Sequence, residues 1–353
     1  MLYNKIDKKL LKKRVANEPF ARKTCSFYRY YPLEDIASLR DRLYYELNEL
    51  SVLGRIYLAA EGINAQCSIP LHQYDNFKHL LSRYDILKNV SLQTGLEEIV
   101  PSFYKLTIKI RPELVATNLP THQANPSLAS PKLDPLTFHE ALTAEKTLAV
   151  DIRNHYEHEV GHFDHALRLP ADTFSDLLPM LPQKLNDKKD HNLLLYCTGG
   201  IRCEKASAYL RHHGFSNVYQ LRGGIIAYAN AVKNHHIASR FKGKNFVFDE
   251  RLGEKISSET IAVCHQCSAP CDTHTNCHYE DCHLLFIQCE QCNTYFNGCC
   301  SIACKEKSAL PIATQRSLRK RPHPKHSALA VHKARAALKK IDRRPLDNPN
   351  PSS

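Results

Sequence analysis

The sequence predicts a protein of mixed α/β and α+β class that folds as several domains. Three observations support this fold class. The chain has 353 residues, which is more than one small sheet accounts for. Short apolar runs that suit strands alternate with apolar residues at helical spacing over much of that length. Ten of the fourteen cysteines lie between Cys264 and Cys304, which sets that segment apart from the rest.

The composition indicates which kind of partner the protein binds and in which cellular compartment it lies. Lys and Arg outnumber Asp and Glu by 48 to 36, so the formal net charge is +12, which favours a polyanionic partner, nucleic acid first among them. No apolar run has the length of a membrane span, and the lysine-rich start lacks the apolar core of a signal peptide. We therefore expect a cytoplasmic protein without membrane association. In that reducing compartment the cysteines are metal ligands or catalytic thiols rather than a disulfide framework.

The amino-terminal part is predicted to be a small α+β unit. After a basic arm, which is either a solvated helix or an RNA contact, the pattern predicts strand, helix, hairpin, helix and strand at residues 25–31, 36–50, 55–69, 77–81 and 103–110. This order is that of a split βαβ unit and resembles ferredoxin-like and acylphosphatase-like domains. Aromatic and basic residues interleave in the first strand, where they either stack unpaired bases or pack in the core. We interpret Glu61-Gly62 as a structural turn.

A linker rich in Pro, Ser and Thr precedes the second domain. Three predicted strands, at residues 148–151, 193–196 and 218–221, alternate with helices, which predicts a doubly wound parallel sheet. The middle strand is apolar enough to be buried on both faces and ends at Cys197. Ligands bind at the carboxyl ends of such strands, so Cys197 lies where a site is expected.

The residues after Cys197 suit an anion-binding loop. Gly199 and Gly200 let backbone N–H groups turn inward, a helix follows the loop, and Arg202 adds a positive charge. These features lower a thiol pKa, so we predict that Cys197 is a thiolate near neutral pH and acts as a nucleophile or carries an adduct. Cys203 either resolves an oxidised or persulfidated Cys197 or packs beneath the loop, and both interpretations stay open.

The cysteine-rich segment predicts metal binding. Two CxxC pairs within forty residues are typical of zinc sites, and the segment is too short and polar to fold on hydrophobic burial alone. Ten thiolates are enough for two sites of four ligands each and leave two cysteines unused, so we predict two structural zinc ions. The sequence does not indicate which cysteines bind which ion, and an iron–sulfur cluster is the alternative. The candidate ligands are Cys264, Cys267, Cys271, Cys277, Cys282, Cys289, Cys292, Cys299, Cys300 and Cys304.

The carboxyl-terminal segment is strongly basic. From Arg316 to Arg344 it has eleven Lys or Arg and one acid, Asp342. Such runs are usually disordered, so we predict a disordered tail that either captures RNA or is only solvated.

These patterns divide the chain into six segments. They are a basic arm (1–19), an α+β domain of RNA-binding type (20–115), a linker (116–135), the doubly wound domain (136–234), a zinc-binding cysteine-rich module (235–310) and a basic disordered tail (311–353).

Two sets of motifs resemble known families. The six residues from Cys197 to Arg202, C-T-G-G-I-R, are similar to the active-site loop of the rhodanese family, whose cysteine carries a persulfide. With A-A-E-G-I-N, C-H-Q-C and the F-V-F-D-E-R segment at 246–251, interpreted as a short strand, the chain from about residue 20 to 310 resembles the rhodanese-like tRNA uridine hydroxylase family. That resemblance implies 5-hydroxylation of the wobble uridine, position 34, in the anticodon loop of tRNA, with molecular oxygen as co-substrate.

The predicted roles combine the residues and the resemblance. Cys197 is the reactive residue and Cys203 assists it. The groups expected to stabilise a bound anion are Arg202 and the backbone amides of Thr198, Gly199, Gly200 and Ile201. No flavin or haem motif is present, and the sequence does not indicate a protein partner. Two functions remain as alternatives: a sulfurtransferase that acts through a Cys197 persulfide, and a non-catalytic, zinc-stapled RNA-binding protein.

Overall fold

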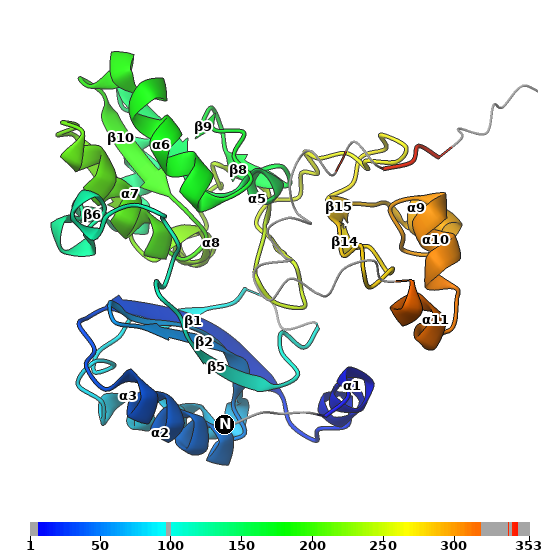
Figure 1. The fold of residues 1–353 in the computed structure, drawn as a ribbon. Helices are drawn as coiled ribbons and strands as arrows, with labels where there is room; N and C mark the ends of the chain where they lie inside the picture. The colour runs from blue at the N-terminus through cyan, green and yellow to red at the C-terminus, as the bar shows by residue number, and fades with distance from the viewer. Residues whose placement is uncertain (1–5, 97–99, 319–337, 339–340, 345–353) are drawn as a thin grey trace, which may run out of the picture.

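The computed structural model describes residues 6–96, 100–318, 338 and 341–344. An amino-terminal α+β domain and a central α/β domain lie one above the other, and a cysteine-rich module lies to one side of both (Figure 1). The predicted fold class is confirmed: the sheets are a mixed five-stranded sheet, a parallel five-stranded sheet and two small sheets of three and two strands.

The amino-terminal domain contains every predicted element. Its sheet has the order β4-β1-β3-β2-β5 and is antiparallel except where β2 pairs with β5. The elements are α1 (Lys8–Ala16), β1 (Arg22–Tyr30), α2 (Ile36–Glu49), β2 (Leu53–Ala59), β3 (Gly62–Pro70), η1 (Leu71–Gln73), α3 (Tyr74–Ser82), β4 (Gln93–Thr94) and β5 (Leu106–Ile110).

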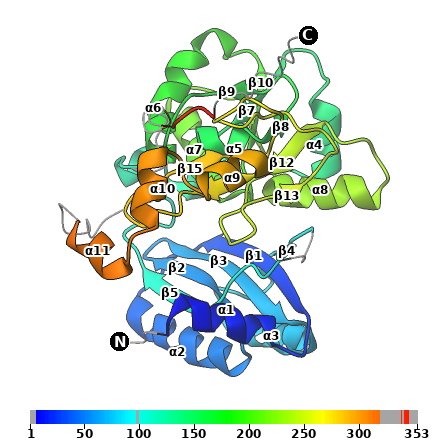
Figure 2. The same cartoon turned by 90° about the vertical axis from the view of Figure 1, so that its right-hand side faces the viewer.

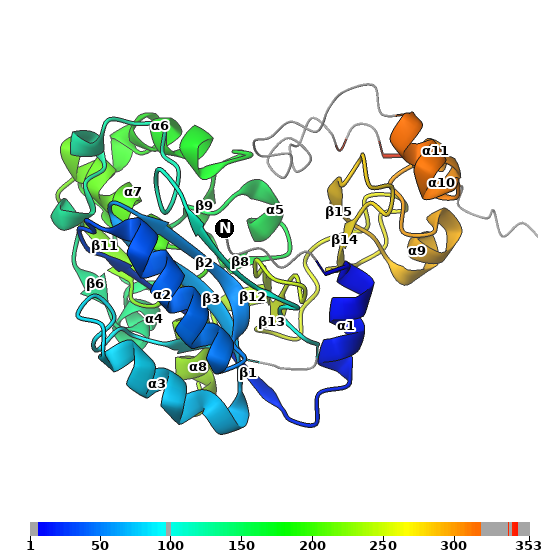
Figure 3. The same cartoon turned by 60° about the horizontal axis from the view of Figure 1, so that its bottom comes forward.

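The two faces of this sheet have different surroundings. Helices α2 and α3 cover one face, where Leu43, Leu47 and Phe77 are buried in a shared core (Figure 3). The other face is directed toward the central domain (Figure 1). Helix α1, from the predicted basic arm, buries Leu11 and Val15, so one side of this helix is not solvated.

The central domain is the predicted doubly wound sheet. Its strands are all parallel in the order β6-β11-β10-β7-β9, with α6 and α7 packed on one face and α4 and α8 on the other. The elements are η2 (Thr121–Gln123), η3 (Pro126–Leu128), β6 (Lys132–Leu133), α4 (Pro135–Ala141), β7 (Thr147–Asp151), α5 (His155–His158), β8 (Gly161–Phe163), β9 (Leu167–Arg168), α6 (Phe174–Lys184), η4 (Asn186–Lys188), β10 (Asn192–Tyr196), α7 (Ile201–His212), β11 (Val218–Leu221) and α8 (Gly224–Asn234).

The segment interpreted as a linker is part of the central domain. Ala124 is buried in the core shared with α6 and α7, and β6 adds the edge strand of the sheet. The backbone N–H of Ser130 donates to Ser207 Oγ at 3.0 Å, and the Gln220 amide donates to the Ser130 carbonyl at 2.7 Å. These buried hydrogen bonds hold the segment against α7 and β11, which its loop-like composition did not indicate.

The carboxyl-terminal part begins on the central domain and ends in the cysteine-rich module. Strand β12 pairs with β8 and with β13. Helices α9 and α10 lie to one side of both large sheets in Figure 1 and therefore face the viewer in Figure 2. The predicted strand at 246–251 is wrong, because β12 ends at Asn245 and these residues form a loop. The elements are β12 (Phe241–Asn245), β13 (Glu254–Lys255), β14 (His274–Asn276), β15 (Leu285–Ile287), α9 (Glu290–Phe296), α10 (Ile302–Ser308) and α11 (Ile312–Ser317).

Parts of the predicted disordered tail have a defined structure. Residues 312–317 form α11, and residues 341–344 contact the cysteine-rich module. There the backbone N–H of Asp342 donates to the Cys300 carbonyl at 3.0 Å, and that of Arg344 donates to the Gln266 carbonyl at 2.9 Å. The remainder of the basic run lies outside the described residues. None of the helices in the described part is long and apolar enough to span a bilayer.

Candidate active site and metal clusters

Cys197 lies in the loop between β10 and α7, as the sequence predicts. Gly200 has φ +99°, a backbone conformation that favours glycine, and it turns the chain into α7. The first turn of α8 packs against this loop, since the backbone N–H of Ile225 donates to the Cys197 carbonyl at 3.0 Å. A side chain at Gly224 would bring its Cβ to 2.5 Å from that carbonyl oxygen. The close packing of the loop against α8 therefore requires glycine at this position.

The Cys197 thiol is surrounded by hydrogen-bond donors. Burial alone raises its pKa, but the Cys203 thiol, the Arg202 charge and the backbone N–H groups of Gly200 and Arg202 outweigh burial and lower the pKa to about 6. Gly200 N lies 3.1 Å from the sulfur. The residue is only 1% exposed, so it forms part of an enclosed wall rather than an open rim. The local electrostatics therefore agree with the predicted thiolate, and the sulfur is buried in the wall of the site.

Arg202 is already paired with a carboxylate. Its two terminal nitrogens donate to Glu157 Oε1 and Oε2 at 2.6 and 2.7 Å, and both side chains are buried. The guanidinium thus contributes a fixed positive field beside Cys197 but has its strongest hydrogen bonds committed to Glu157. Glu157 was not among the predicted site residues. The available signal was Asn154, which forms a capping box with Glu157 at the start of α5.

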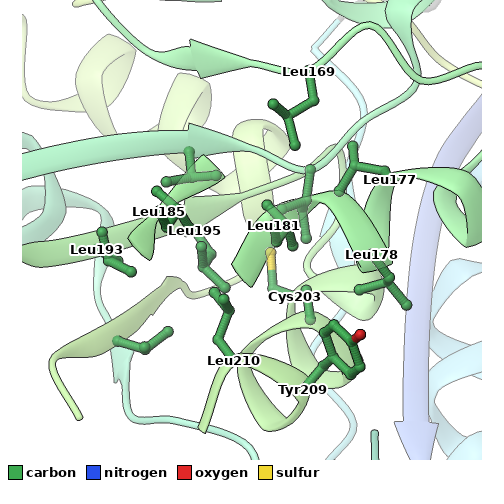
Figure 4. Close-up of a cluster of buried hydrophobic side chains, with 14 of the residues drawn as sticks. Leu169, Leu177, Leu178, Leu181, Leu185, Leu193, Leu195, Cys203, Tyr209 and Leu210 are labelled. Carbon is green, nitrogen blue, oxygen red and sulfur yellow. The ribbon is translucent and has the colours of Figure 1, made fainter. Parts of the chain in front are cut away.

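Cys203 packs beneath the loop and also contacts Cys197, whereas its role as a resolving thiol stays a prediction. The residue is completely buried among leucines of α6, α7 and β10, as Figure 4 shows. Its thiol also donates a hydrogen bond to the Cys197 sulfur, and burial followed by that contact raises the pKa of Cys203 well above its ordinary value. Cys203 is therefore a neutral donor to a neighbouring thiolate.

The other loop residues have separate surroundings. Thr198 Oγ1 donates to Glu157 Oε2 at 3.3 Å, and the Ile201 carbonyl accepts from Tyr30 Oη at 3.3 Å. Among the described residues beyond Gly199 and its two chain neighbours, no heavy atom lies within 4 Å of the position that a Cβ at Gly199 would occupy, so this part of the loop borders open space.

A cavity of about 960 Å³ lies between the two domains and includes Cys197 in its wall. The loop at 247–251 forms one side, and the amino-terminal sheet forms another. The residues that this sheet contributes include Tyr28, Tyr30, Arg55, Tyr57, Asn64 and Gln66. Because Phe27, directly before Tyr28, is buried in the core, the strand divides its aromatic residues between cavity and core.

Polar contacts join the two domains beside the cavity. Tyr28 Oη donates to Glu204 Oε1 at 3.0 Å, and burial, followed by the Glu204 charge, raises the pKa of Tyr28. Lys205, on α7, lies 2.9 Å from Glu61 Oε1 and 3.3 Å from Glu113 Oε2. Glu61 therefore does more than form a turn, since it also links the hairpin to the helix that follows Cys197.

Eight of the ten candidate ligands form two clusters. In each cluster the four sulfur atoms lie within 4.8 Å of one another. Four converging thiols fit a tetrahedral, closed thiolate site for a structural metal ion. The clusters are Cys264, Cys267, Cys289 and Cys292, and Cys277, Cys282, Cys300 and Cys304. Cys271 and Cys299 lie outside both, so they are the pair left over, which spacing alone did not identify.

The first cluster is joined to the helix that carries Glu157. Val160, two residues after the end of α5, is buried in the same apolar group as Cys264, Cys271 and Cys292. His265 Nε2 lies 2.9 Å from Glu159 Oε1. The module is therefore packed against the segment that orients Arg202.

Sequence profiles of three domain families match consecutive parts of the chain. The UPF0176 acylphosphatase like domain matches residues 22–114, the Rhodanese-like domain matches residues 134–231 and the Rhodanase C-terminal family matches residues 242–305. These ranges coincide with the three parts of the fold.

Relatives of nearly the same length share about half of the residues. Proteins named tRNA uridine(34) hydroxylase from Pectobacterium carotovorum subsp. carotovorum (strain PC1) and Yersinia pestis (strain Pestoides F) are each 48% identical over 320 residues, covering 90% of both chains. The protein of that name from Photorhabdus laumondii is 49% identical over 320 residues, covering 90% of this chain and 91% of its own. With this identity over this length, the chain belongs to the tRNA uridine(34) hydroxylase family.

Proposed function

We propose that this protein hydroxylates C5 of the wobble uridine, position 34, in tRNA. The observation that carries the proposal is the placement of a thiol with a pKa of about 6 in the wall of a cavity lined by tyrosine, amide and arginine side chains. Tyrosines accept a flat base, and arginines accept the adjoining phosphates. Loop nucleotides are already partly unstacked, so delivery of one base to an enclosed thiol costs little.

The residues have distinct proposed roles. Cys197 is the reactive thiolate, either adding to C6 of uracil or carrying an oxidised sulfur. The Gly200 amide and the Arg202 field stabilise negative charge at the loop, and Glu157 holds the Arg202 guanidinium in place. Cys203 donates a hydrogen bond to Cys197 and favours its ionised form.

The two cysteine clusters are proposed to bind zinc in a structural role. Closed sites with four thiolates leave no position for a substrate, so their contribution is to stabilise the fold of the module. Molecular oxygen is the proposed source of the hydroxyl oxygen, and a two-electron donor such as an external thiol reduces the second oxygen atom to water. Because tRNA is the proposed substrate, we place the protein in the cytoplasm, where the anticodon loop is its partner.

The test is nucleoside mass spectrometry of tRNA from cells that lack the protein and from the same cells supplied with it. We expect 5-hydroxyuridine and its derivatives to disappear without the protein and to return with the wild-type chain but not with Cys197→Ser. Unchanged oxidised uridine in the deleted cells would refute the proposal. Formation of thiocyanate from thiosulfate and cyanide, without uridine oxidation, would favour a sulfurtransferase instead.

A further inference from the structure

The face of the amino-terminal sheet that lines the cavity carries two amide side chains from a single strand. Asn64 and Gln66 lie on β3, two residues apart, so both side chains are directed to the same face. Both line the cavity and are half-buried, whereas Ile63 and Ala65 between and before them are buried in the opposite core. Their amides are therefore available to a ligand in the same space as Cys197.

Two tyrosines lie on either side of Asn64 in the sheet. In the strand register, Tyr28 of β1 and Tyr57 of β2 are the direct neighbours of Asn64. Side chains directly opposite each other on one sheet face stand about 5 Å apart. This row therefore presents an amide between two aromatic rings, which suits a flat heterocycle that needs both a surface and an edge contact.

The amides restrain each other. Gln66 Nε2 donates to Asn64 Oδ1 at 2.9 Å. This leaves Asn64 Nδ2 as a donor and Gln66 Oε1 as an acceptor, and neither has a further protein partner among the described residues. Arg55 is the direct neighbour of Gln66 on β2, and its guanidinium donates to the Phe248 carbonyl, so this hydrogen bond of Arg55 does not use Gln66 Oε1.

This donor and acceptor match one pyrimidine and oppose the other. Uracil presents an acceptor at O4 beside a donor at N3–H, whereas cytosine presents a donor at its 4-amino group beside an acceptor at N3. We infer that Asn64 donates to O4 of the target uracil and that Gln66 accepts from its N3–H, so that this pair selects uridine over cytidine at the reacting position. The inference rests on the proposed function and deepens it by assigning the residues that recognise the base.

The same contact assists the chemistry. A hydrogen bond to O4 draws electron density away from the C5=C6 double bond, which makes C6 a better target for a thiolate. Recognition and activation of the base therefore use one side chain, on the opposite wall of the cavity from the reactive loop.

The experiment compares binding of two anticodon stem-loop RNAs that differ only in U or C at position 34. Binding is measured in the Cys197→Ser background, where no turnover occurs. We expect a preference for U34 of roughly tenfold or more, the size of one good polar base contact. Asn64→Asp replaces the donor by an acceptor but keeps the oxygen that receives Gln66 Nε2, so we expect weaker U34 binding and a preference that disappears or reverses toward C34.

The control is Asn76→Asp, an exposed asparagine on α3 with no place in the cavity, which should keep the wild-type ratio. Asn64→Ser is the second variant, should Asn64→Asp fold poorly, and it should also reduce the U34 preference. A U34 to C34 ratio that stays at the wild-type value in a folded Asn64 variant would overturn the inference. The U34 to C34 ratio is measured by binding and does not depend on turnover. The ratio in the Asn64 variants therefore tests the role of Asn64, whereas hydroxylation by the wild-type chain tests the proposed function.

Discussion

The reactive loop and the cysteine-rich module use the same side chain in opposite surroundings. Cys197 contacts backbone N–H groups, a donor thiol and the field of Arg202, so a single sulfur is ionised without a metal ion. In each cluster, four thiols point at one another. Four ionised sulfurs within 4.8 Å repel unless a cation lies between them, so these thiols need a metal to be thiolates together. The groups that face a cysteine, more than its burial, therefore decide whether its thiol is ionised without a metal ion.

Removal of the reactive sulfur should have the largest effect. We expect Cys197→Ser to lower the rate of uridine hydroxylation at least about a thousandfold, since the nucleophile is lost while the cavity remains. Quantification of 5-hydroxyuridine formed in tRNA by the purified protein measures this. Cys271→Ser, outside the loop and both clusters, is the matched control and should stay within a few-fold of wild type; near-normal activity of Cys197→Ser would show that the loop is not the reactive site.

Loss of a cluster ligand should change metal content rather than chemistry. Because each closed site takes four thiolates, the native protein should contain about two zinc ions and Cys264→Ser about one. Elemental analysis of freshly purified protein, together with its thermal unfolding, measures this. We expect a lower melting temperature for Cys264→Ser, whereas Cys271→Ser and Cys299→Ser should keep both ions. Equal metal loss in the last two variants would contradict the grouping.

The buried Glu157–Arg202 pair should contribute more to stability than surface pairs. Glu157→Gln leaves the Arg202 charge buried without its carboxylate, so we expect the free energy of unfolding in urea to fall by about 3 kcal/mol. The control is Asp75→Asn, which breaks the exposed pair between Asp75 and Lys78 and should leave the unfolding midpoint unchanged. Equal stability of the two variants would mean that Glu157 is not needed to hold Arg202.

The smallest expected effect concerns the neighbouring thiol. Cys203 donates to Cys197 and lowers its pKa, so Cys203→Ala should raise that pKa and reduce the thiolate fraction at neutral pH. The acid limb of the pH profile of kcat/KM should therefore move to higher pH. Cys203→Ser keeps a donor and should restore most of the wild-type profile. Identical profiles for all three proteins would leave Cys203 with a packing role alone.

Local patterns predicted the fold and the reactive loop because both depend on residues close in sequence. The alternation in β1 and β3, the apolar run of β10 and the glycines after Cys197 each specify their own conformation. The loop at 246–251 was misread as a strand because its alternating Phe246 and Phe248 suit a strand. In the structure they pack edge to face with each other, and Phe246 also contacts Tyr156 and His274.

Contacts between distant segments were not predictable in this way. Glu157 lies 45 residues before Arg202, and the sequence around each residue does not predict that the two form an ion pair. The spacing of ten cysteines allows many sets of four, and only the folded module separates Cys271 and Cys299 from the rest. Likewise, the sequence did not indicate that the amino-terminal sheet would form the wall opposite Cys197.

We expect Cys197 to be ionised near neutral pH without a metal ion. The most direct measurement is the difference in thiolate absorbance near 240 nm between the wild-type protein and Cys197→Ser as the pH is raised, since the cluster thiols contribute equally to both. The pKa of about 6 means that the difference signal is small in acid, reaches half its height near pH 6 and is nearly complete at pH 7.5 or so. A midpoint at about 8.5 or above, the range of an ordinary cysteine, would contradict the claim.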